Sequence, residues 1–233
     1  MASKVTSKHL QTSVGMIHYL ESKNLSGDLF VLFHPYSKNA SFAINMFKFL
    51  QKDYHLIAID LPFHGKTNLI KPEFNSKDIS KILLDIKGLY PKKRLTLIGH
   101  SFGSRMICLA ISQKQISPYK TIFYGPELGF NGYTKIFLTK KAYYLCRPLA
   151  SLLMTKQILH GLSLLLFRLK IIDKIAFDFL KLHQDPKSKS SLLRLWKSLA
   201  NTNKDLLFIK KNSELLSNPI VLFGLRDKTT PYN

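Results

Sequence analysis

LTLIGHSFGSRMICLAI, residues 95–111, is the stretch of sequence that decides the fold of this chain. It starts as a short apolar run, turns at GHSFG (99–103) and continues with the composition of a helix. An apolar run without polar alternation is typical of a strand that is buried on both faces. We therefore predict a strand over 94–100, a tight turn, and a helix over 101–115.

The segments around this stretch alternate between the same two patterns. Isoleucine and leucine recur at helical spacing over 76–90, which predicts an amphipathic helix. Strands are also predicted over 15–21, 28–35, 54–62 and 119–125, and a further helix over 39–53. Apolar strands that alternate with helices indicate a mostly parallel, doubly wound sheet that helices cover. The sequence therefore predicts an α/β fold.

One long segment interrupts this alternation. Residues 130–215 are helix-like throughout, whereas 218–227 returns to the buried-strand pattern. Between residues 131 and 211 there are 16 Lys and Arg and 4 Asp, so more than half of the chain's net charge of +21 lies there. The simplest organisation is an α/β core formed by 1–129 and 216–233, with a helical cap inserted at 130–215.

Composition and charge limit the function classes. Hydrophobic residues make up 45% of the 233, which allows a sizeable core. The charge of +21 favours anionic partners, or else reflects a lysine-rich source. Cys108 and Cys146 have no metal-ligand spacing and are expected to be buried in a reducing compartment. No signal peptide and no apolar run of about 18 residues is present, so we predict a cytoplasmic protein, soluble or peripheral to the membrane.

The pentapeptide at 99–103 has the pattern G-x-S-x-G. A strand-to-helix turn this sharp holds its serine in a strained conformation, and Gly99 and Gly103 let the neighbouring backbone approach. Ser101 then lies at a helix N-terminus beside His100, where the N–H of Phe102 can point at an oxyanion. This favours Ser101 as a catalytic nucleophile. The alternative is a strand-to-helix turn with a solvated serine.

At this point the chain resembles the α/β-hydrolase family, and three other stretches carry the resemblance. FHPYSKNASF is similar to the family's oxyanion loop, with Pro35 where the family usually has glycine. The resemblance implies that Tyr36 supplies the second oxyanion N–H, while His34 orders the loop. DLPFHGKT (60–67) is similar to the family's Asp-x-Pro-Gly-x-Gly-x-Ser loop, with Phe63 in place of the first glycine.

The third stretch, PIVLFGLRDKTTP (219–231), is similar to the strand and loop that present the family's catalytic acid, which implies that role for Asp227. Two alternatives stay open. Asp227 could be a turn or capping residue, and Glu127 could be the acid, because some family members carry it after the preceding strand. The resemblance covers nearly the whole chain and places the family's variable cap at 130–215. It implies a serine hydrolase that needs no cofactor and no metal.

The sequence lacks the base of such a hydrolase. The nucleophile's proton must pass to a histidine that the acid orients, and the family's chain order is serine, acid, histidine. No histidine follows Asp227, although typical element lengths place one roughly 25 residues beyond the acid. His34 and His64 are alternatives for the base, but both fit loop-ordering positions. His9, His18 and His55 are expected to be surface or strand residues.

Two explanations of the missing base follow. The sequence could be a piece of a longer hydrolase that lacks the last strand, which we favour because that loss exposes a sheet edge. Otherwise it is a complete relative with impaired catalysis. Genomic DNA beyond the codon for Asn233 would separate the two, since an open frame with a later histidine supports the enzyme.

The sequence therefore predicts hydrolysis of a small or medium ester, or a related acyl bond, through an acyl-enzyme on Ser101. Apolar cap residues favour a substrate with an apolar group. The alternative function is a non-catalytic or membrane-associated relative. For this, the basic amphipathic segment 140–182 would lie on an anionic membrane, although it also fits an ordinary cap. Neither nucleic-acid binding nor a dinucleotide or metal site is supported by a motif.

Overall fold

The computed structural model describes residues 5–127 and 186–224, with a few positions between 141 and 169. The chain divides into two compact units. The first comprises residues 1–129 and 202–233, and the second comprises residues 130–201. The sheet and all of its strands belong to the first unit. The boundaries predicted for the cap, 130–215, stay a prediction.

Strands and helices follow one another along the chain. The strands are β1 (Val5–Gln11), β2 (Gly15–Ser22), β3 (Leu29–Phe33), β4 (His55–Ile59), β5 (Asn68–Leu69), β6 (Leu95–His100), β7 (Lys120–Tyr124) and β8 (Pro219–Leu222). The structure describes the helices α1 (Ala40–Met46), α2 (Ser76–Gly88), α3 (Phe102–Ile111) and α8 (Pro186–Lys211), and the 3₁₀ helices η1 (Lys48–Lys52) and η2 (Ser213–Leu216).

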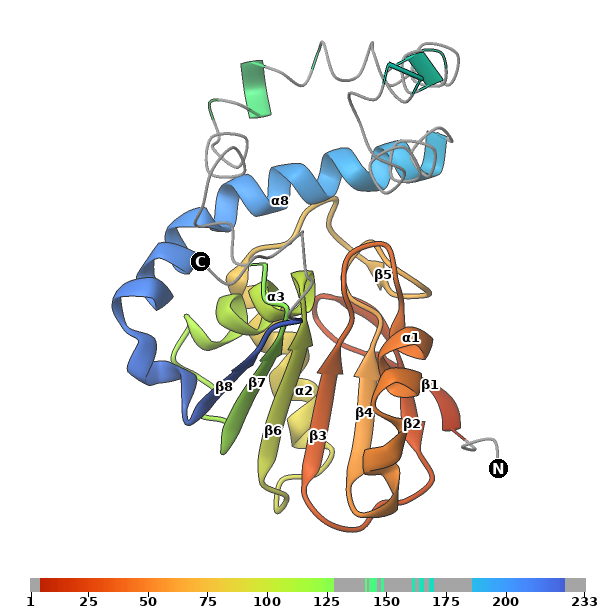
Figure 1. The fold of residues 1–233 in the computed structure, drawn as a ribbon, viewed down its shortest axis with the longest axis vertical. Coiled ribbons are helices and arrows are strands. Elements are labelled where there is room, and N and C mark those ends of the chain that lie inside the picture. The colour runs from red at the N-terminus through yellow and green to blue at the C-terminus, as the bar shows by residue number, and fades with distance from the viewer. Residues whose placement is uncertain are drawn as a thin grey trace. The chain divides into compact units, whose positions relative to one another are not determined.

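The strands form one mixed sheet that is mostly parallel, as the sequence predicts. Their order is β1-β2-β4-β3-β6-β7-β8, which Figure 1 shows from right to left, and the short β5 pairs with β2. From β4 to β8 every neighbouring pair is parallel, whereas β1 and β2 are antiparallel to their neighbours. In this register Phe33 of β3 and Phe123 of β7 both lie opposite Gly99 of β6. The loops after these three strands therefore emerge at one edge of the sheet.

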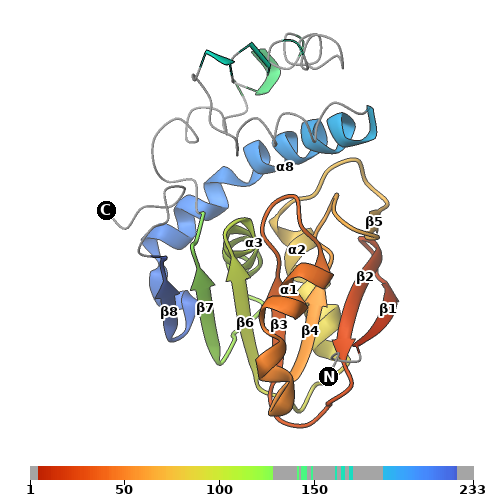
Figure 2. The same cartoon turned by 45° about the vertical axis from the view of Figure 1, so that its right-hand side comes forward.

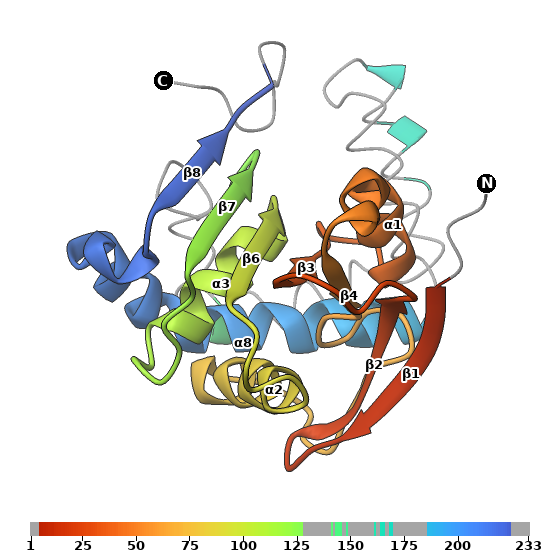
Figure 3. The ribbon, with the colours of Figure 1, turned by 90° about the horizontal axis from the view of Figure 1, so that it is seen from below.

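Helices cover both faces of this sheet. Figure 2 and Figure 3 show α1 on one face and α2 with α3 on the other. Beneath α1, buried side chains of the helix and of the strands form a core cluster that includes Ala43, Ile44, Leu32, Leu56 and Ile98. β3 and β4, inside the sheet, are buried along nearly their whole length, which explains their apolar runs. β8 is exposed at every position from Pro219 to Leu222, so the prediction of a buried strand is wrong there.

The sequence predicted most of these elements, but it missed two strands and one helix end. β1 was not predicted because its residues, VTSKHLQ, are mostly polar and alternate between half-buried and exposed. β5 is only two residues long. The helix predicted over 39–53 is α1 followed by η1. It breaks at Phe47, whose backbone (φ −105°, ψ 20°) leaves the helical region.

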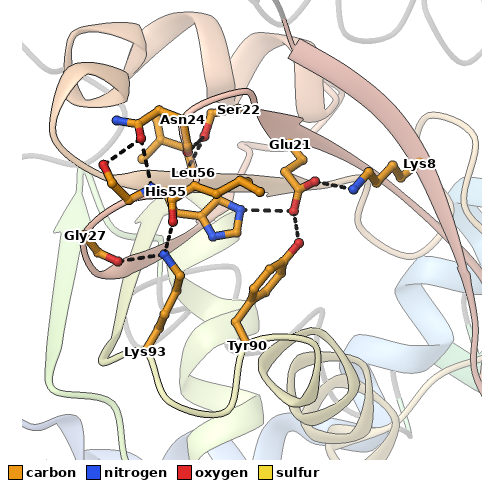
Figure 4. Close-up of polar contacts among 11 residues, drawn as sticks. Lys8, Glu21, Ser22, Asn24, Gly27, His55, Leu56, Tyr90 and Lys93 are labelled. Atoms are coloured by element: carbon orange, nitrogen blue, oxygen red, sulfur yellow. Dashed lines mark hydrogen bonds and ion pairs between the residues drawn. The ribbon is translucent and has the colours of Figure 1, made fainter.

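A buried polar cluster lies at the opposite edge of the sheet, where the parallel strands begin (Figure 4). Glu21 of β2 is 2% exposed and accepts a hydrogen bond from Nε2 of His55 at 3.0 Å. Lys8 and Tyr90 also donate to its carboxylate. Burial raises the pKa of Glu21, but these three donors together hold it below the ordinary value. The cluster joins β1, β2 and β4 to the segment that follows α2.

Candidate active site

The nucleophile predicted from the sequence occupies a strained turn. Ser101 connects β6 to α3 with φ 50° and ψ −114°, a combination that few residues other than glycine adopt. Its N–H donates to the carbonyl of Tyr124 on the neighbouring strand at 2.9 Å, and its carbonyl accepts from Ser104 at 2.9 Å. The predicted tight turn between a strand and a helix is therefore present.

The two flanking glycines are required by close backbone approach. A Cβ at Gly99 would lie 2.7 Å from the N and Cα of Ser104. A Cβ at Gly103 would lie only 2.2 Å from the carbonyl oxygen of Phe33 on β3. Both distances are shorter than a real Cβ contact, so the G-x-S-x-G spacing lets β6, α3 and β3 pack around the serine.

The two predicted oxyanion residues lie close to each other. Phe102 is the first residue of α3, where backbone N–H groups have no acceptor within the helix. The ring of Tyr36, from the loop after β3, lies 6.1 Å from the ring of Phe102 and nearly perpendicular to it. Burial raises the pKa of the Tyr36 phenol, so it stays protonated at neutral pH. The oxyanion role of the two N–H groups stays a prediction.

His34, the loop-ordering residue that the resemblance implies, lies in the loop after β3 and bonds to the backbone through both ring nitrogens. The side chain is fully buried, and its Nδ1 donates to the carbonyl of Pro35 at 2.8 Å. Its Nε2 accepts from the N–H of Leu61 at 3.0 Å. Burial lowers the pKa of His34 to about 4, so the ring is neutral at pH 7 with both nitrogens engaged. It offers no lone pair to a serine proton.

His64 has a similar place in the next loop. Its Nδ1 donates to the carbonyl of Pro62 at 2.9 Å, and its Nε2 accepts from the N–H of Ser37 at 3.4 Å. Its ring lies 5.0 Å from that of His34 and 5.8 Å from that of Phe102. Burial lowers the pKa of His64, so this ring is also neutral at pH 7. Its hydrogen bonds link the loops after β3 and β4.

Asp60 is a residue that sequence reasoning did not single out. It is 2% exposed, and its carboxylate accepts from the N–H of Ala40 at 2.7 Å and from that of Lys66 at 2.8 Å. Its carboxylate also pairs with Nδ1 of His18 at 2.6 Å, and His18, expected at the surface or in a strand, is buried in β2. A carboxylate that directly follows the apolar run LIAI of β4 was the available signal. Asp60 therefore ties the 60–67 loop to the start of α1.

Arg105 is the second residue that was missed. It lies on α3 and is 2% exposed, and its Nη2 pairs with Oε1 of Glu127 at 3.1 Å. The N–H of Glu127 donates to the carbonyl of Ser101 at 3.3 Å. The signal was a single charged residue within the apolar segment RMICLAI. Asp227, the favoured acid, lies outside the described residues, and so do His160, His183 and Cys146.

Some predicted absences can be compared only with the described residues. Within residues 5–127 and 186–224 no three side chains of His, Cys, Asp or Glu come together as metal ligands. Cys108 is fully buried in α3, and burial raises its pKa to about 12. No helix in the described part of the chain has the length and apolar character needed to span a membrane. Membrane contact by segment 140–182 stays a prediction.

Comparison with known proteins supports the same fold. Residues 28–118 match the family model described as the alpha/beta hydrolase fold. A candidate epoxide hydrolase from Pseudomonas aeruginosa superposes with a TM-score of 0.65 at 16% identity, over 100% of this chain and 82% of the other. The Cif epoxide hydrolase from Acinetobacter nosocomialis gives 0.63 at 18% identity, over 97% and 75%. The epoxide hydrolase CorEH gives 0.62 at 12% identity, over 95% and 90%.

No curated protein sequence matches the chain. At these identities the solved structures establish the fold alone, and their substrates belong to those proteins. The family match spans β3 to the end of α3, which includes the strained serine and the loops beside it. The sheet order, the elbow at Ser101 and this match together show that the chain has the α/β-hydrolase fold.

Proposed function

We propose that the protein is a serine hydrolase that cleaves a carboxylic ester, or a related acyl bond, through an acyl-enzyme on Ser101. The strained conformation of Ser101, at φ 50° between a buried strand and a helix, carries the proposal. Backbone strain of this kind costs about 1–3 kcal/mol and persists where function selects it. The flanking glycines support this interpretation, because each avoids a collision that any other residue would create.

In the proposed reaction Ser101 Oγ attacks the acyl carbon while its proton passes to a base. The N–H groups of Phe102 and Tyr36 hold the oxyanion of the tetrahedral intermediate. When the intermediate collapses, the C–O bond of the ester breaks and the leaving alcohol takes the proton from the base. Water then attacks the acyl-enzyme in the same way and releases the carboxylic acid and the free serine.

The proposed acid is Asp227, and the base is a histidine that it would orient. Neither His34 nor His64 fits the role of base, because both ring nitrogens of each are engaged with the backbone. Glu127 is less suited than Asp227 to act as the acid, because its Oε1 already pairs with Arg105.

The nucleophile also favours acyl chemistry over the epoxide opening that the structural neighbours' names describe. A serine oxygen that opened an epoxide would be left as an ether, which water does not cleave at neutral pH. The same oxygen on an acyl group forms an ester, which a second attack by water releases. Phe42 of α1 is 36% exposed, and its ring stacks on that of His100 with the centroids 6.0 Å apart. This exposed aromatic side chain suits a substrate with an apolar group.

The second candidate is a relative that binds ligands without catalysis. It is favoured by one specific observation, that the loop histidines His34 and His64 are both committed to backbone hydrogen bonds. In such a protein the elbow would persist as a structural turn. The ring cluster of Tyr36, His64 and Phe102 would then belong to a binding surface.

A fluorophosphonate probe tests the proposal, because it phosphonylates serines that a base activates. In the intact protein we expect labelling of the wild type and of Ser112→Ala, a control at the end of α3, and none of Ser101→Ala. Equal labelling of wild type and Ser101→Ala would exclude Ser101 as the nucleophile. A folded wild type that takes no label would favour the non-catalytic candidate. With labelling established, p-nitrophenyl esters of increasing acyl length measure the apolar preference, and styrene oxide is expected to stay intact.

A further inference from the structure

We infer that Arg105 and Glu127 form a positioning pair that fixes the backbone of the nucleophile elbow and takes no part in the proton relay. The inference rests on the proposed function, because positioning matters only if Ser101 reacts. It assigns a purpose to a buried arginine that neither the oxyanion loop nor the proposed acid explains.

The pair closes a ring of contacts around Ser101. Arg105 lies one helical turn after Ser101 in α3, and its guanidinium holds the carboxylate of Glu127 at 3.1 Å. Glu127 follows β7, and its backbone N–H donates to the carbonyl of Ser101 at 3.3 Å. The N–H of Ser101 donates in turn to Tyr124, also on β7, at 2.9 Å. One short segment thus holds both backbone polar groups of the strained residue, and the ion pair ties that segment to α3.

Burial makes the charge of Arg105 depend on this contact. Arg105 is 2% exposed and lies in a helix whose other residues are apolar or small, whereas the Glu127 side chain is 34% exposed. A buried guanidinium needs a counter-ion, since an uncompensated buried charge is strongly destabilising. Its Nε has no hydrogen-bond partner among the described residues, so Glu127 is the partner that the structure records for this side chain.

The same contact argues against Glu127 as the acid of the relay. An acid in that role accepts a hydrogen bond from the histidine and stabilises the imidazolium charge. Here Arg105 already neutralises the carboxylate and occupies Oε1, so a cationic histidine would compete with a fixed guanidinium. The geometry instead suits a group that holds backbone in place, because Glu127 reaches Ser101 through its main chain.

A double-mutant cycle tests the pair in the intact protein. The variants are Arg105→Met, Glu127→Gln, their combination, and Arg105→Lys as the conservative replacement. Each is measured for the rate constant of fluorophosphonate labelling, for kcat and KM with a p-nitrophenyl ester, and for the free energy of unfolding. Lys81→Met is the matched control, because Lys81 pairs with Asp85 at 2.6 Å on the exposed side of α2.

If the pair positions the elbow, Arg105→Met lowers kcat roughly 10- to 100-fold with little change in KM, since small misplacement of reacting groups costs up to about 100-fold. The kcat of the double variant is then no lower than that of the less active single variant. Arg105→Lys recovers part of the rate, and Lys81→Met leaves the rate unchanged. The loss of kcat is measured under conditions where every variant is fully folded. A pair that contributed to stability alone would cause no loss of kcat under those conditions.

Two results would overturn the inference. If Glu127→Gln alone loses about 10⁴-fold while Arg105→Met loses far less, Glu127 is the acid of the relay. If all variants label at the wild-type rate, the pair has no bearing on Ser101. Failure of the proposed function looks different, because the wild type itself then takes no label or labels without Ser101.

Discussion

Three non-glycine residues with left-handed backbone border the candidate site. Ser101 (φ 50°), Phe63 (φ 65°) and Ser37 (φ 59°) each lie in a loop that follows one of the parallel strands. Such conformations cost about 1–3 kcal/mol each and tend to cluster where the backbone serves a function. Phe63 stands where the family resemblance leads one to expect glycine, so this chain keeps the backbone shape without the residue that allows it most easily.

Gly103 gives the sharpest prediction at the level of single residues. Gly103→Ala places a methyl group against the Phe33 carbonyl at 2.2 Å, so the elbow and β3 must separate. We expect a loss of about 3 kcal/mol in the free energy of unfolding, measured by urea titration. Gly88→Ala is the control, because nothing lies within 4 Å of its Cβ and alanine favours a helix by about 1 kcal/mol. Equal stability of the two variants would contradict the close approach.

The pKa of His34 predicts how stability depends on pH. Burial lowers it from 6.5 to about 4, so between these values the unfolded chain binds a proton that the folded chain does not. The free energy of unfolding should therefore fall by up to about 3 kcal/mol as the pH drops from 6.5 to 4. His34→Gln removes this titration and should flatten the dependence over that window. An unchanged slope in the variant would show that His34 is not the group responsible.

At the level of the elements, one carboxylate joins β1, β2 and β4 at the end of the sheet where the parallel strands begin. Glu21 receives three side-chain donors, from Lys8, His55 and Tyr90, while it is almost fully buried. The ring of Tyr90 also packs at right angles on His55, with centroids 4.4 Å apart. One side chain therefore satisfies donors from two strands and from the segment after α2.

Replacing that carboxylate should be far more costly than replacing its exposed partner. Glu21→Gln keeps the shape but loses the charge, and we expect a loss of about 3 kcal/mol in the free energy of unfolding. Lys8→Met should cost less than about 1 kcal/mol, because the Lys8 side chain is 41% exposed and Glu21 keeps two donors. Urea titration of both variants measures the difference. Similar losses in the two would mean that the buried donors contribute little.

For the molecule as a whole, the sequence predicted what local patterns carry. The parallel strands are mostly apolar, so their places and the elbow between β6 and α3 followed from the local sequence pattern. Contacts between distant elements were not predictable in this way. The pair of Arg105 with Glu127 depends on the register of β6 and β7, and the three partners of Asp60 come from separate segments. The acid role of Asp227 and the cap remain predictions.

The pairing of β8 with β7 also bears on how the chain folds during synthesis. Strands β1 to β7 and helices α1 to α3 all lie within residues 5–124, so this part of the sheet can assemble while the rest of the chain is still being translated. The free side of β7 stays unpaired until β8 has been synthesised, and Pro219 of β8 then pairs with Thr121. Throughout that interval the nascent protein exposes an unpaired edge to chaperones and to neighbouring chains.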